Sequence, residues 1–506
     1  MTPLTPSGGC PILSLVIFAP LVAAAVAAFI PSERLLRWWS LIATLAIAVG
    51  SVALYTGFDL TTHAFQFVEF APWIAAFRIN YALGIDGISL LLILLTTFIM
   101  PLCVLASWKY ITTRVKEFMI CLLVMESAMI GVFSALDFVL FFVFWEAMLI
   151  PMTLMIGVWG GPRKVYAAVK FFIYTMAGSV FLLVAIVALY LWDPANQTFS
   201  IPELMGRPYS QSFQAWIFAA FFISFAIKVP MFPFHTWLPA AHVEAPTAGS
   251  VILASVLLKM GTYGFVRFCL PITPLGAAYH APFVMWLSVA AILYGGFAAL
   301  AQSDLKKLVA YSSVSHMGFA TLGIFSLTTA GLQGATLVMI NHGVTTGALF
   351  ICVGIIYERL HTRDLGESAG LGKFAPVLAG MVGLFCLSSM AFPGTNSFIG
   401  EFLVLSGGFT VSTLMMCIAV PGVVAAAAYN LRMLQKFAYG STKNPDHSGV
   451  PDLSAREIFA LAPLVIFVLW IGLQPGPFVD VMKVSVDHLV QTTQAAIAQA
   501  AAVAAQ

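Results

Sequence analysis

Residues 228–247 read KVPMFPFHTWLPAAHVEAPT and interrupt what would otherwise be a long apolar run. Residues 213–227 before them are almost wholly apolar, and residues 248–268 after them are apolar apart from Lys259 and Arg267. A charged lysine such as Lys228, held in hydrocarbon, costs about 2.5–3.5 kcal/mol on insertion scales. The stretch therefore places a cation where the surrounding protein has to stabilise it.

Two prolines in this stretch predict a broken helix. Pro230 and Pro233 cannot donate backbone hydrogen bonds, so the carbonyls of Ala226 and Val229, beside Lys228, lose their helical partners. Broken backbone at membrane depth is tolerated only inside protein or beside a water-filled cavity, and transporters place coupling-ion sites at interrupted helices. We expect the freed carbonyls, with any water they hold, to contact the lysine. The alternative is a kinked helix whose lysine reaches the membrane interface.

The composition excludes a soluble globular protein. Of the 506 residues, 61% are apolar and only 9% are charged, which predicts an all-α polytopic membrane protein. The seven cysteines are scattered with no CxxC pair, which argues against zinc, iron–sulfur ligation and a disulfide framework. No glycine-rich nucleotide motif is found, and the net charge of +2 gives no indication of nucleic acid. We expect this chain to bind no metal, cofactor or nucleic acid.

Fourteen segments are long enough to cross about 30 Å of hydrocarbon, which takes about 20 helical residues each. The first has no basic region before it, so it is interpreted as a retained helix. The predicted spans are 11–30, 39–55, 85–108, 118–136, 138–158, 166–192, the broken seventh from 213, 248–268, 281–301, 308–327, 332–357, 374–409, 413–438 and 458–473. Residues 55–83 are expected to form a polar, aromatic loop. Most lysines and arginines fall in the loops of one side, which predicts that both termini lie outside the cytoplasm.

The twelfth span predicts a second interrupted helix. At 1.5 Å per residue, residues 374–409 would extend about 54 Å, well over the hydrocarbon thickness. Its middle reads FPGTNSFIGEF, with Pro393, Gly394 and Gly400 as helix breakers before Glu401. This break and the first one each fall in the fourth member of a five-helix set, helices 4–8 and 9–13. Two such units are what an inverted repeat predicts, because an odd helix count flips the second copy.

The chain is accordingly divided into four parts. Residues 1–110 form an N-terminal three-helix segment, 117–270 and 280–440 the two five-helix repeats, and 441–506 the last transmembrane helix with a C-terminal tail. Residues 474–506 are expected to be an interfacial helix or frayed chain, and no function is assigned to them.

Titratable residues recur near the centres of the predicted spans. Each is expensive in a membrane and by default marks an ion or proton path. Burial disfavours the charged form while an opposite charge favours it, so a group balanced between the two changes protonation when its partner moves. The set therefore favours proton relay over metal or substrate binding. Its members are Glu126, Glu146, Lys228, Lys259, His316, His342 and Glu401.

A purely structural role is the alternative for each residue. Glu146 and Lys259, on helices expected to be intact, are equally compatible with a static ion pair between helices. His316 in YSSVSHMG and His342 in INHGVTTGALF lie among hydroxylated residues that can hold water, or they are packed core histidines. Glu126 in MESAMIG is also compatible with a bond to a neighbouring helix.

Three further polar residues lie near span ends. His235 and His242, seven residues apart with Pro239 between them, are candidates for the point where protons enter, although a loop-packing role is favoured. Asp86 in YALGIDGISLLL begins the third helix, where the helix dipole favours a carboxylate, so capping is its expected role.

Several motifs resemble a known family. KVPMFPFHTWLPAAHVEAPTAGSVILASVLLKMGTYG resembles the signature of the antiporter-like, proton-pumping subunits of respiratory complex I, and AHVEAPTAGSVILA resembles their NuoM branch. FFVFWEAMLIPM, DLKKLVAYSSVSHMG, NHGVTTGALF and FPGTNSFIGEFLVL support this resemblance, which covers about residues 80–440.

The resemblance implies fourteen transmembrane helices, two inverted repeats and a proton channel along a hydrophilic axis at mid-membrane. By matching motif, Glu146 would be the fifth-helix glutamate and Lys228 its seventh-helix partner. Lys259 would be the central lysine, and Glu401 the terminal residue of the relay. His316 and His342 would connect the centre to Glu401.

The resemblance also implies partners. The chain would be a subunit of a proton-translocating NADH:quinone reductase in the bacterial inner membrane, beside sister antiporter-like subunits and lipid. NADH, FMN, iron–sulfur clusters and quinone would belong to partner subunits, and this chain would carry no redox centre. Their electron transfer would switch the Glu146–Lys228 pair from a distance.

Two alternatives remain. An Mrp-type cation/proton antiporter subunit would share the fold, although the resemblance implies lysine rather than Glu401 at the terminal position there. A non-pumping scaffold, in which buried charges only align the helices, belongs to a different class.

Overall fold

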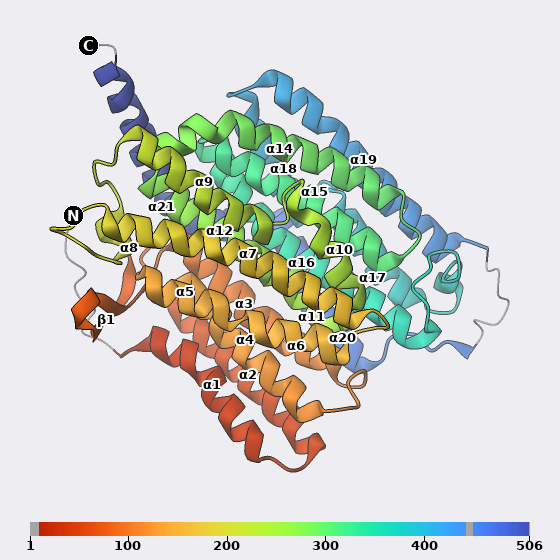
Figure 1. The fold of residues 1–506 in the computed structure, drawn as a ribbon. Coiled ribbons are helices and arrows are strands. Elements are labelled where there is room, and N and C mark those ends of the chain that lie inside the picture. Colours follow the sequence, from red (N-terminus) through yellow and green to blue (C-terminus); the bar gives the residue numbers. More distant parts are fainter. Residues whose placement is uncertain (1–9, 442–448, 505–506) are drawn as a thin grey trace.

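The computed structural model describes residues 10–441 and 449–504. Residues 1–9 of the predicted N-terminal segment, and residues 442–448 and 505–506 of the predicted C-terminal one, lie outside this range. Among the described residues, twelve helices are long enough and apolar enough to cross a membrane. Most of the helices form one bundle with broadly aligned axes (Figure 1). The prediction of a multi-span, essentially all-helical membrane protein is confirmed.

The first half of the chain supplies the helices on the lower side of Figure 1. Their bounds are α1 (Ile12–Phe29), α2 (Glu33–Thr56), α3 (Gly87–Ser107), α4 (Val115–Ser134), α5 (Phe138–Ala147), α6 (Leu149–Trp159), α7 (Lys164–Leu191), α8 (Ile201–Leu204), α9 (Gln211–Lys228), α10 (Trp237–Glu244), α11 (Thr247–Ile252), α12 (Leu258–Gly264) and α13 (Leu270–Ile272). Short turns occur at η1 (Ala75–Phe77) and η2 (Phe234–Thr236), and π-helical turns at η3 (Leu253–Leu257) and η4 (Phe265–Cys269).

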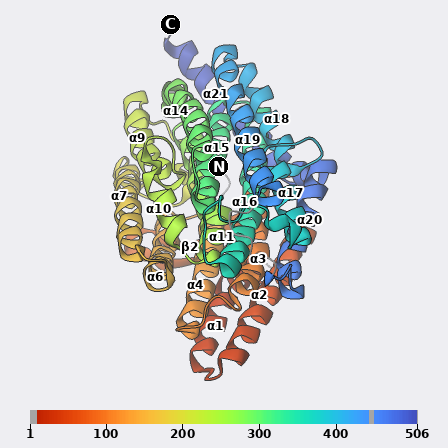
Figure 2. The ribbon, with the colours of Figure 1, turned by 90° about the vertical axis from the view of Figure 1, so that its right-hand side faces the viewer.

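The second half packs beside the first and is seen from another side in Figure 2. Its helices are α14 (Pro274–Leu300), α15 (Leu305–Phe325), α16 (Thr329–Leu360), α17 (Pro376–Ser389), α18 (Asn396–Phe409), α19 (Thr413–Tyr439), α20 (Ala455–Leu473) and α21 (Gly476–Ala504), with a short turn η5 (Leu371–Lys373). α16 is wholly inside the protein over its most apolar window. It packs against α15, α17, α18, α20 and α21, and therefore forms the centre of this half.

Both predicted interruptions are present. α9 ends at Lys228, and regular α-helix resumes only at Trp237. α17 ends at Ser389 and α18 begins at Asn396, with Gly394 between them at a φ of 90° that glycine adopts readily. Glu401 lies within α18, just beyond its first turn. The exact number of transmembrane helices and the inverted repeat stay predictions.

Two spans expected to be regular are not, which corrects the expectation of intact helices around Glu146 and Lys259. The fifth span divides into α5 and α6 at Met148, two residues after Glu146. In the eighth span the segment carrying Lys259, α12, lies between the π-helical turns η3 and η4. Such turns frequently mark functional sites. Both central titratable residues therefore lie next to irregular backbone.

A β hairpin replaces the irregular loop expected before the third span. β1 (Gln66–Ile74) pairs with β2 (Ile79–Ile85) in an antiparallel sheet. The tip turns at Arg78, which has left-handed backbone geometry. Glu69 on β1 accepts a 2.8 Å hydrogen bond from the Leu13 amide, so the hairpin caps the free amides at the start of α1. Alternating aromatic and β-branched residues in this segment were the available signal.

The C-terminal tail forms one long helix rather than frayed chain. α21 packs across α3, α13, α14 and α16 at the end of the bundle that carries the hairpin (Figure 1). The Ser485 hydroxyl accepts a 3.1 Å hydrogen bond from the Gly87 amide at the start of α3. Of the two expectations for this segment, a helix lying across the span ends is the one observed.

Candidate functional site

Lys228 is buried inside the protein at the end of α9. Its side chain is 3% exposed, so it does not reach an interface. The Nζ atom lies 4.8 Å from the centre of the Trp145 ring and 3.7 Å from the Met148 sulfur. A cation over an indole face is stabilised by the ring quadrupole, by about 2 kcal/mol or more when desolvated. The α5–α6 junction therefore supplies the environment of the α9 lysine.

The carbonyls freed at the break are not the contacts of Lys228, which corrects that expectation. The Ala226 carbonyl accepts from the Met231 amide at 2.9 Å, and the Ile227 carbonyl accepts from the Trp237 indole at 2.8 Å. The chain thus re-satisfies backbone groups locally after the prolines, as membrane helices commonly do.

Glu146 is half-buried and lies near Lys228 without touching it. Its Oε1 atom is enclosed with no hydrogen-bond partner among the described residues. Neither a Glu146–Lys228 nor a Glu146–Lys259 ion pair within 4.0 Å is present in that part of the chain, so the static ion pair considered from the sequence is not made. The carboxylate and the ammonium are therefore separated in this structure.

Lys259 is fully buried at the centre of the eighth span. Its Nζ atom lies 2.6 Å from His342 Nδ1 on α16 and also donates to the Ala254 carbonyl within η3. A Cβ at Gly261 would lie 2.7 Å from the Val229 side chain, so only glycine allows this helix to approach the break after α9 so closely. The π-helical turn and Gly261 together place the lysine between α9 and α16.

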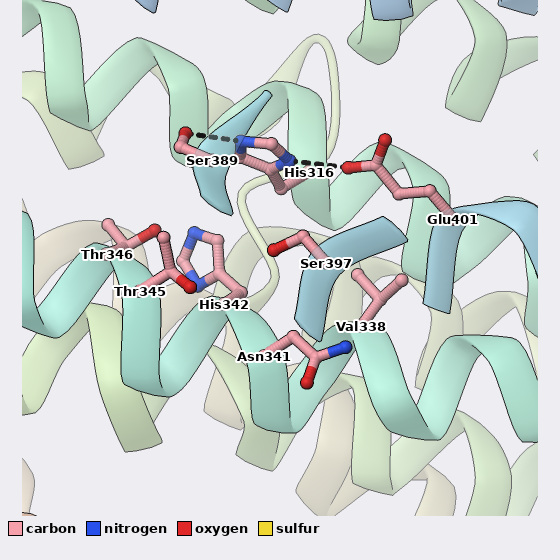
Figure 3. Close-up of a pocket in the computed structure, with 9 residues that line it drawn as sticks. All are labelled: His316, Val338, Asn341, His342, Thr345, Thr346, Ser389, Ser397 and Glu401. Carbon is pink, nitrogen blue, oxygen red and sulfur yellow. Dashed lines mark hydrogen bonds and ion pairs between the residues drawn. The ribbon is translucent and has the colours of Figure 1, made fainter. Parts of the chain in front are cut away.

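His316 and Glu401 form the second contact of the buried set (Figure 3). His316 Nδ1 on α15 lies 3.0 Å from Glu401 Oε1 on α18. The other ring nitrogen, Nε2, lies 3.2 Å from the Tyr429 hydroxyl and 3.3 Å from the Ser389 hydroxyl, at the end of α17. Asn430 donates to the same serine at 3.2 Å. Every polar atom of the imidazole therefore has a partner, which fixes the ring.

A small pocket joins the two contacts. The His316 and His342 rings lie 5.8 Å apart between centres, and the enclosed space beside them has room for about one water molecule. Figure 3 shows His316, His342 and hydroxyls around this space. His342 Nε2 is buried without a partner in the described chain. The lining residues are His316, Val338, Asn341, His342, Thr345, Thr346, Ser389, Ser397 and Glu401.

The structure thus brings four of the six predicted site residues into one connected group. Lys259, His342, His316 and Glu401 follow one another across α12, α16, α15 and α18. Glu146 and Lys228 form a separate pair of neighbours at the α5–α9 contact. Within residues 10–441 and 449–504, no hydrogen bond joins the two groups.

The remaining candidates have different surroundings. Glu126 is fully buried and both carboxylate oxygens lack a hydrogen-bond partner in the described chain, so it does not bond to a neighbouring helix as considered. His235 packs 4.8 Å from the Tyr294 ring, which fits the loop-packing interpretation. His242 stacks 4.4 Å from the Phe350 ring with both nitrogens buried and unpartnered. Asp86 caps α3 by accepting from the Ser89 amide at 2.9 Å, as predicted.

Sequence reasoning missed several polar residues of the site. Tyr429 and Ser389 contact His316, and the Asn341 side chain on α16 donates to the Asn396 carbonyl at the start of α18. Single hydroxyls and amides in apolar segments gave no periodic signal. Lys306, which was not among the candidates, is buried and donates to the Ala245 carbonyl at 2.7 Å. In the described chain, no group of three or more metal-binding side chains is present.

Comparison with known protein families gives two adjoining matches. Residues 135–427 match the family described as NADH:quinone oxidoreductase/Mrp antiporter, transmembrane. Residues 15–132 match the family described as NADH-ubiquinone oxidoreductase chain 4, amino terminus. The first match alone covers more than half of the chain.

Individual relatives agree over nearly the whole length. The chain is 46% identical over 500 residues to NADH-quinone oxidoreductase subunit M of Rhodobacter capsulatus, covering 96% of this chain and 97% of that protein. It is 45% identical over 482 residues to NADH-ubiquinone oxidoreductase chain 4 of Arabidopsis thaliana, covering 95% and 97%.

Solved structures share the fold. A chain in the structure of respiratory complex I from Thermus thermophilus with bound NADH superimposes with a TM-score of 0.87 at 31% identity, covering 95% of this chain and 99% of that one. A chain of the Mrp complex from Dietzia sp. DQ12-45-1b gives a TM-score of 0.82 at 22% identity, covering 95% and 55%, which is a likeness of fold alone.

Proposed function

Because this chain belongs to the NADH:quinone oxidoreductase/Mrp antiporter family, in its subunit M (chain 4) branch, we propose that it translocates protons through the buried Glu/Lys/His relay described above. The observation that carries the proposal is the connected group from Lys259 through His342 and His316 to Glu401. Four titratable side chains in one buried line, each at most 5% exposed, are expensive unless they move charge.

The contacts define a sequence of proton transfers. Lys259 Nζ gives a proton to His342 Nδ1 across 2.6 Å, and the ring then releases its own proton from Nε2 into the pocket. The Ser389 hydroxyl, which lines the same pocket, would take up the released proton as it delivers its own to His316 Nε2, and Nδ1 of that ring would pass one to Glu401 Oε1 across 3.0 Å. Each imidazole accepts on one nitrogen and donates from the other, which leaves it in the opposite tautomer, so each ring has to return to its starting tautomer before the next proton.

The Glu146–Lys228 pair would act as the switch. Glu146 Oε1 has no hydrogen-bond partner in the described chain and Lys228 lies over Trp145, which supports the assignment of this arrangement to an open state of the pair. If Glu146 and Lys228 came into contact, the carboxylate charge of Glu146 would be neutralised by Lys228. It would then act less on the rest of the site, and the proton affinity of Lys259 would change. A coupling change of two pKa units is about 2.7 kcal/mol, and moving one charge through 100 mV takes about 2.3 kcal/mol. The free-energy change of the switch is therefore similar to that of moving one proton across the membrane potential.

The energy would come from other subunits. NADH oxidation with FMN and iron–sulfur clusters, and quinone reduction, would take place in partner chains of the complex, and sister antiporter-like subunits would flank this one. The relatives named as NADH-quinone oxidoreductase subunits support this assignment. The chain is a multi-span protein of a respiratory complex. Its placement in a bacterial inner membrane, with both termini on the periplasmic side, is part of the proposal.

The test uses the assembled complex with Glu146→Gln or Lys228→Ala. We expect NADH–quinone activity and NADH-driven proton uptake to fall together, because both residues set the switch. Glu33→Gln, at a 61% exposed carboxylate, and Lys483→Ala, at an exposed lysine, are the matched controls. Wild-type activity and pumping in both test variants would refute the assigned roles.

A cation/proton antiporter subunit is the second candidate, because the matching family description also names Mrp antiporters. The likeness to the Mrp chain is one of fold, whereas the relatives above 40% identity are named as NADH oxidoreductase subunits. Sodium-gradient dependence of transport in the purified complex would favour the antiporter, and its absence the NADH-linked function.

A further inference from the structure

A second buried polar cluster lies beyond the relay, at the other end of the Lys259 helix. Arg267 Nη2 lies 2.7 Å from Asp86 Oδ1 and 3.1 Å from the Ser89 hydroxyl, and its Nε donates to the Tyr263 hydroxyl at 3.1 Å. All four side chains are at most 7% exposed. Arg267, near the end of the predicted eighth span, is an internal cation that the relay does not use.

The hydrogen bonds in this cluster run in one direction only. The Tyr263 hydroxyl donates its one proton to the Phe133 carbonyl at 3.1 Å and therefore cannot donate to a second group. It accepts from Arg267, and the 3.0 Å contact with Ser89 is therefore donated by the serine. Ser89 in turn accepts from Arg267. Among these side chains the bonds start at the guanidinium and end at a carbonyl or at the Asp86 carboxylate, which also accepts from the Ser89 amide.

The cluster lies between Lys259 and one end of the bundle. Tyr263 and Arg267 are about one and two helical turns beyond Lys259 on the same side of the helix. α21 lies directly outside: a Cβ at Gly87 would fall 1.9 Å from the Val481 carbonyl oxygen. The Phe133 and Tyr263 rings pack edge to face at 5.2 Å between α4 and α12.

The surroundings of Lys259 are different toward the other end. There, His242 has two buried nitrogens without partners in the described chain, so polar groups remain free to hold water. At the Arg267 end every member of the cluster has its partners. Polar groups on the α10 side of Lys259 therefore have free hydrogen-bonding positions, whereas those on the α21 side all have partners.

We propose that Arg267, with Asp86, Ser89 and Tyr263, is a plug that stops protons leaking from Lys259 to the α21 end of the bundle; this rests on the proton-transfer function proposed above. A proton wire needs groups that both accept and donate. The guanidinium has five donors, no acceptor, and is not deprotonated in proteins. A fixed arginine also excludes protons electrostatically in other pores. Arg267 is thus a positioning residue: it confines proton transfer from Lys259 to the path through His342 and blocks the path toward α21.

The plug is tested by passive leak in the whole complex, reconstituted in liposomes without NADH. Decay of an imposed pH gradient is followed with a trapped pH dye and valinomycin as the charge shunt. The double variant Asp86→Asn/Arg267→Gln keeps the net charge but removes the guanidinium, and a several-fold faster decay is expected. Arg267→His introduces a group that can accept and donate, and it carries the test if the double variant does not assemble.

Three controls separate a plug from a structural role. Arg267→Lys retains a cation beside Asp86, which favours the charged ammonium, and because this form has no acceptor the wild-type leak rate is expected. Arg207→Gln changes an arginine outside the cluster and is expected to leave the leak unchanged. Adding Lys259→Ala to Arg267→His should return the leak to the wild-type rate, because the leak is routed through Lys259.

A wild-type leak rate in an assembled Arg267→His or double variant overturns the plug. An equal leak rise in Arg267→Lys also overturns it, since general loosening would then be the cause. Because this assay contains no NADH, its outcome is independent of the activity test of Glu146 and Lys228. Failure of the plug therefore leaves the pumping proposal standing, and failure of pumping leaves the leak result interpretable.

Discussion

Lys259 Nζ lies 2.6 Å from His342 Nδ1, although the two residues are on different helices and 83 positions apart. The contact depends on backbone that departs from a regular helix, because the π-helical turn η3 directs its Ala254 carbonyl at the same ammonium. Gly343, next to the histidine, allows the close approach: a Cβ there would lie 2.9 Å from the Ser255 carbonyl oxygen. The pair is the point where the two halves of the chain exchange a proton in the proposed relay.

Replacing His342 by Gln should interrupt this exchange. Glutamine keeps a polar side chain of similar size but cannot accept a proton and release another. Because a positioned proton-transfer group typically contributes at least about 100-fold in rate, we expect NADH-driven proton uptake to fall at least about tenfold even if a water bypasses the site. Uptake is measured by a fluorescent ΔpH probe in reconstituted complex. His361→Gln, at an exposed histidine, is the control, and equal uptake in both variants would contradict the role of His342.

The contacts of His316 predict a graded pair of effects. Glu401→Gln removes the carboxylate that receives the proton, so proton uptake should fall about as far as in His342→Gln. Tyr429→Phe removes one of two hydroxyls at Nε2 while Ser389 remains, and a smaller, several-fold decrease is expected. The same ΔpH assay measures both. Tyr279→Phe, at a 68% exposed tyrosine, controls for loss of a hydroxyl. A larger effect of Tyr429→Phe than of Glu401→Gln would reverse the assigned order.

Gly261 predicts a packing effect on the switch. An added methyl would meet the Val229 side chain at 2.7 Å and the Phe225 carbonyl oxygen at 3.0 Å, so Gly261→Ala should push the Lys259 helix away from the break in the seventh span. Overpacking of this kind costs about 1–3 kcal/mol. We expect a lower thermal midpoint of the complex and reduced pumping. Gly380→Ala, where a Cβ meets nothing within 4 Å, is the matched control, and identical melting of the two variants would argue against the close contact.

Much of the fold could be predicted because its signals are local. Pro230 and Pro233 remove hydrogen bonds from their own helix, and Pro393 with Gly394 does the same in the twelfth span, so both breaks were visible in the sequence. The β hairpin was missed, since an aromatic polar stretch before Leu83 was taken for a loop. The departures at Met148 and on both sides of Lys259 were missed too. The departure at Met148 has a local signal, because Pro151 cannot donate a hydrogen bond to the Ala147 carbonyl four residues back. The π-helical turn η3 contains no proline and packs against α16.

The candidate site divides in the same way. The sequence alone indicated that Lys228, Lys259, His316, His342 and Glu401 are within spans, because apolar segments of membrane-spanning length surround each of them. Tertiary structure decided the partners: Lys259 contacts His342 rather than Glu146, Lys228 faces Trp145 rather than freed carbonyls, and Arg267 is an internal cation. Composition and periodicity act within one helix, whereas partners are set by which helix faces meet, and in the Arg267–Asp86 pair the two residues are 181 positions apart.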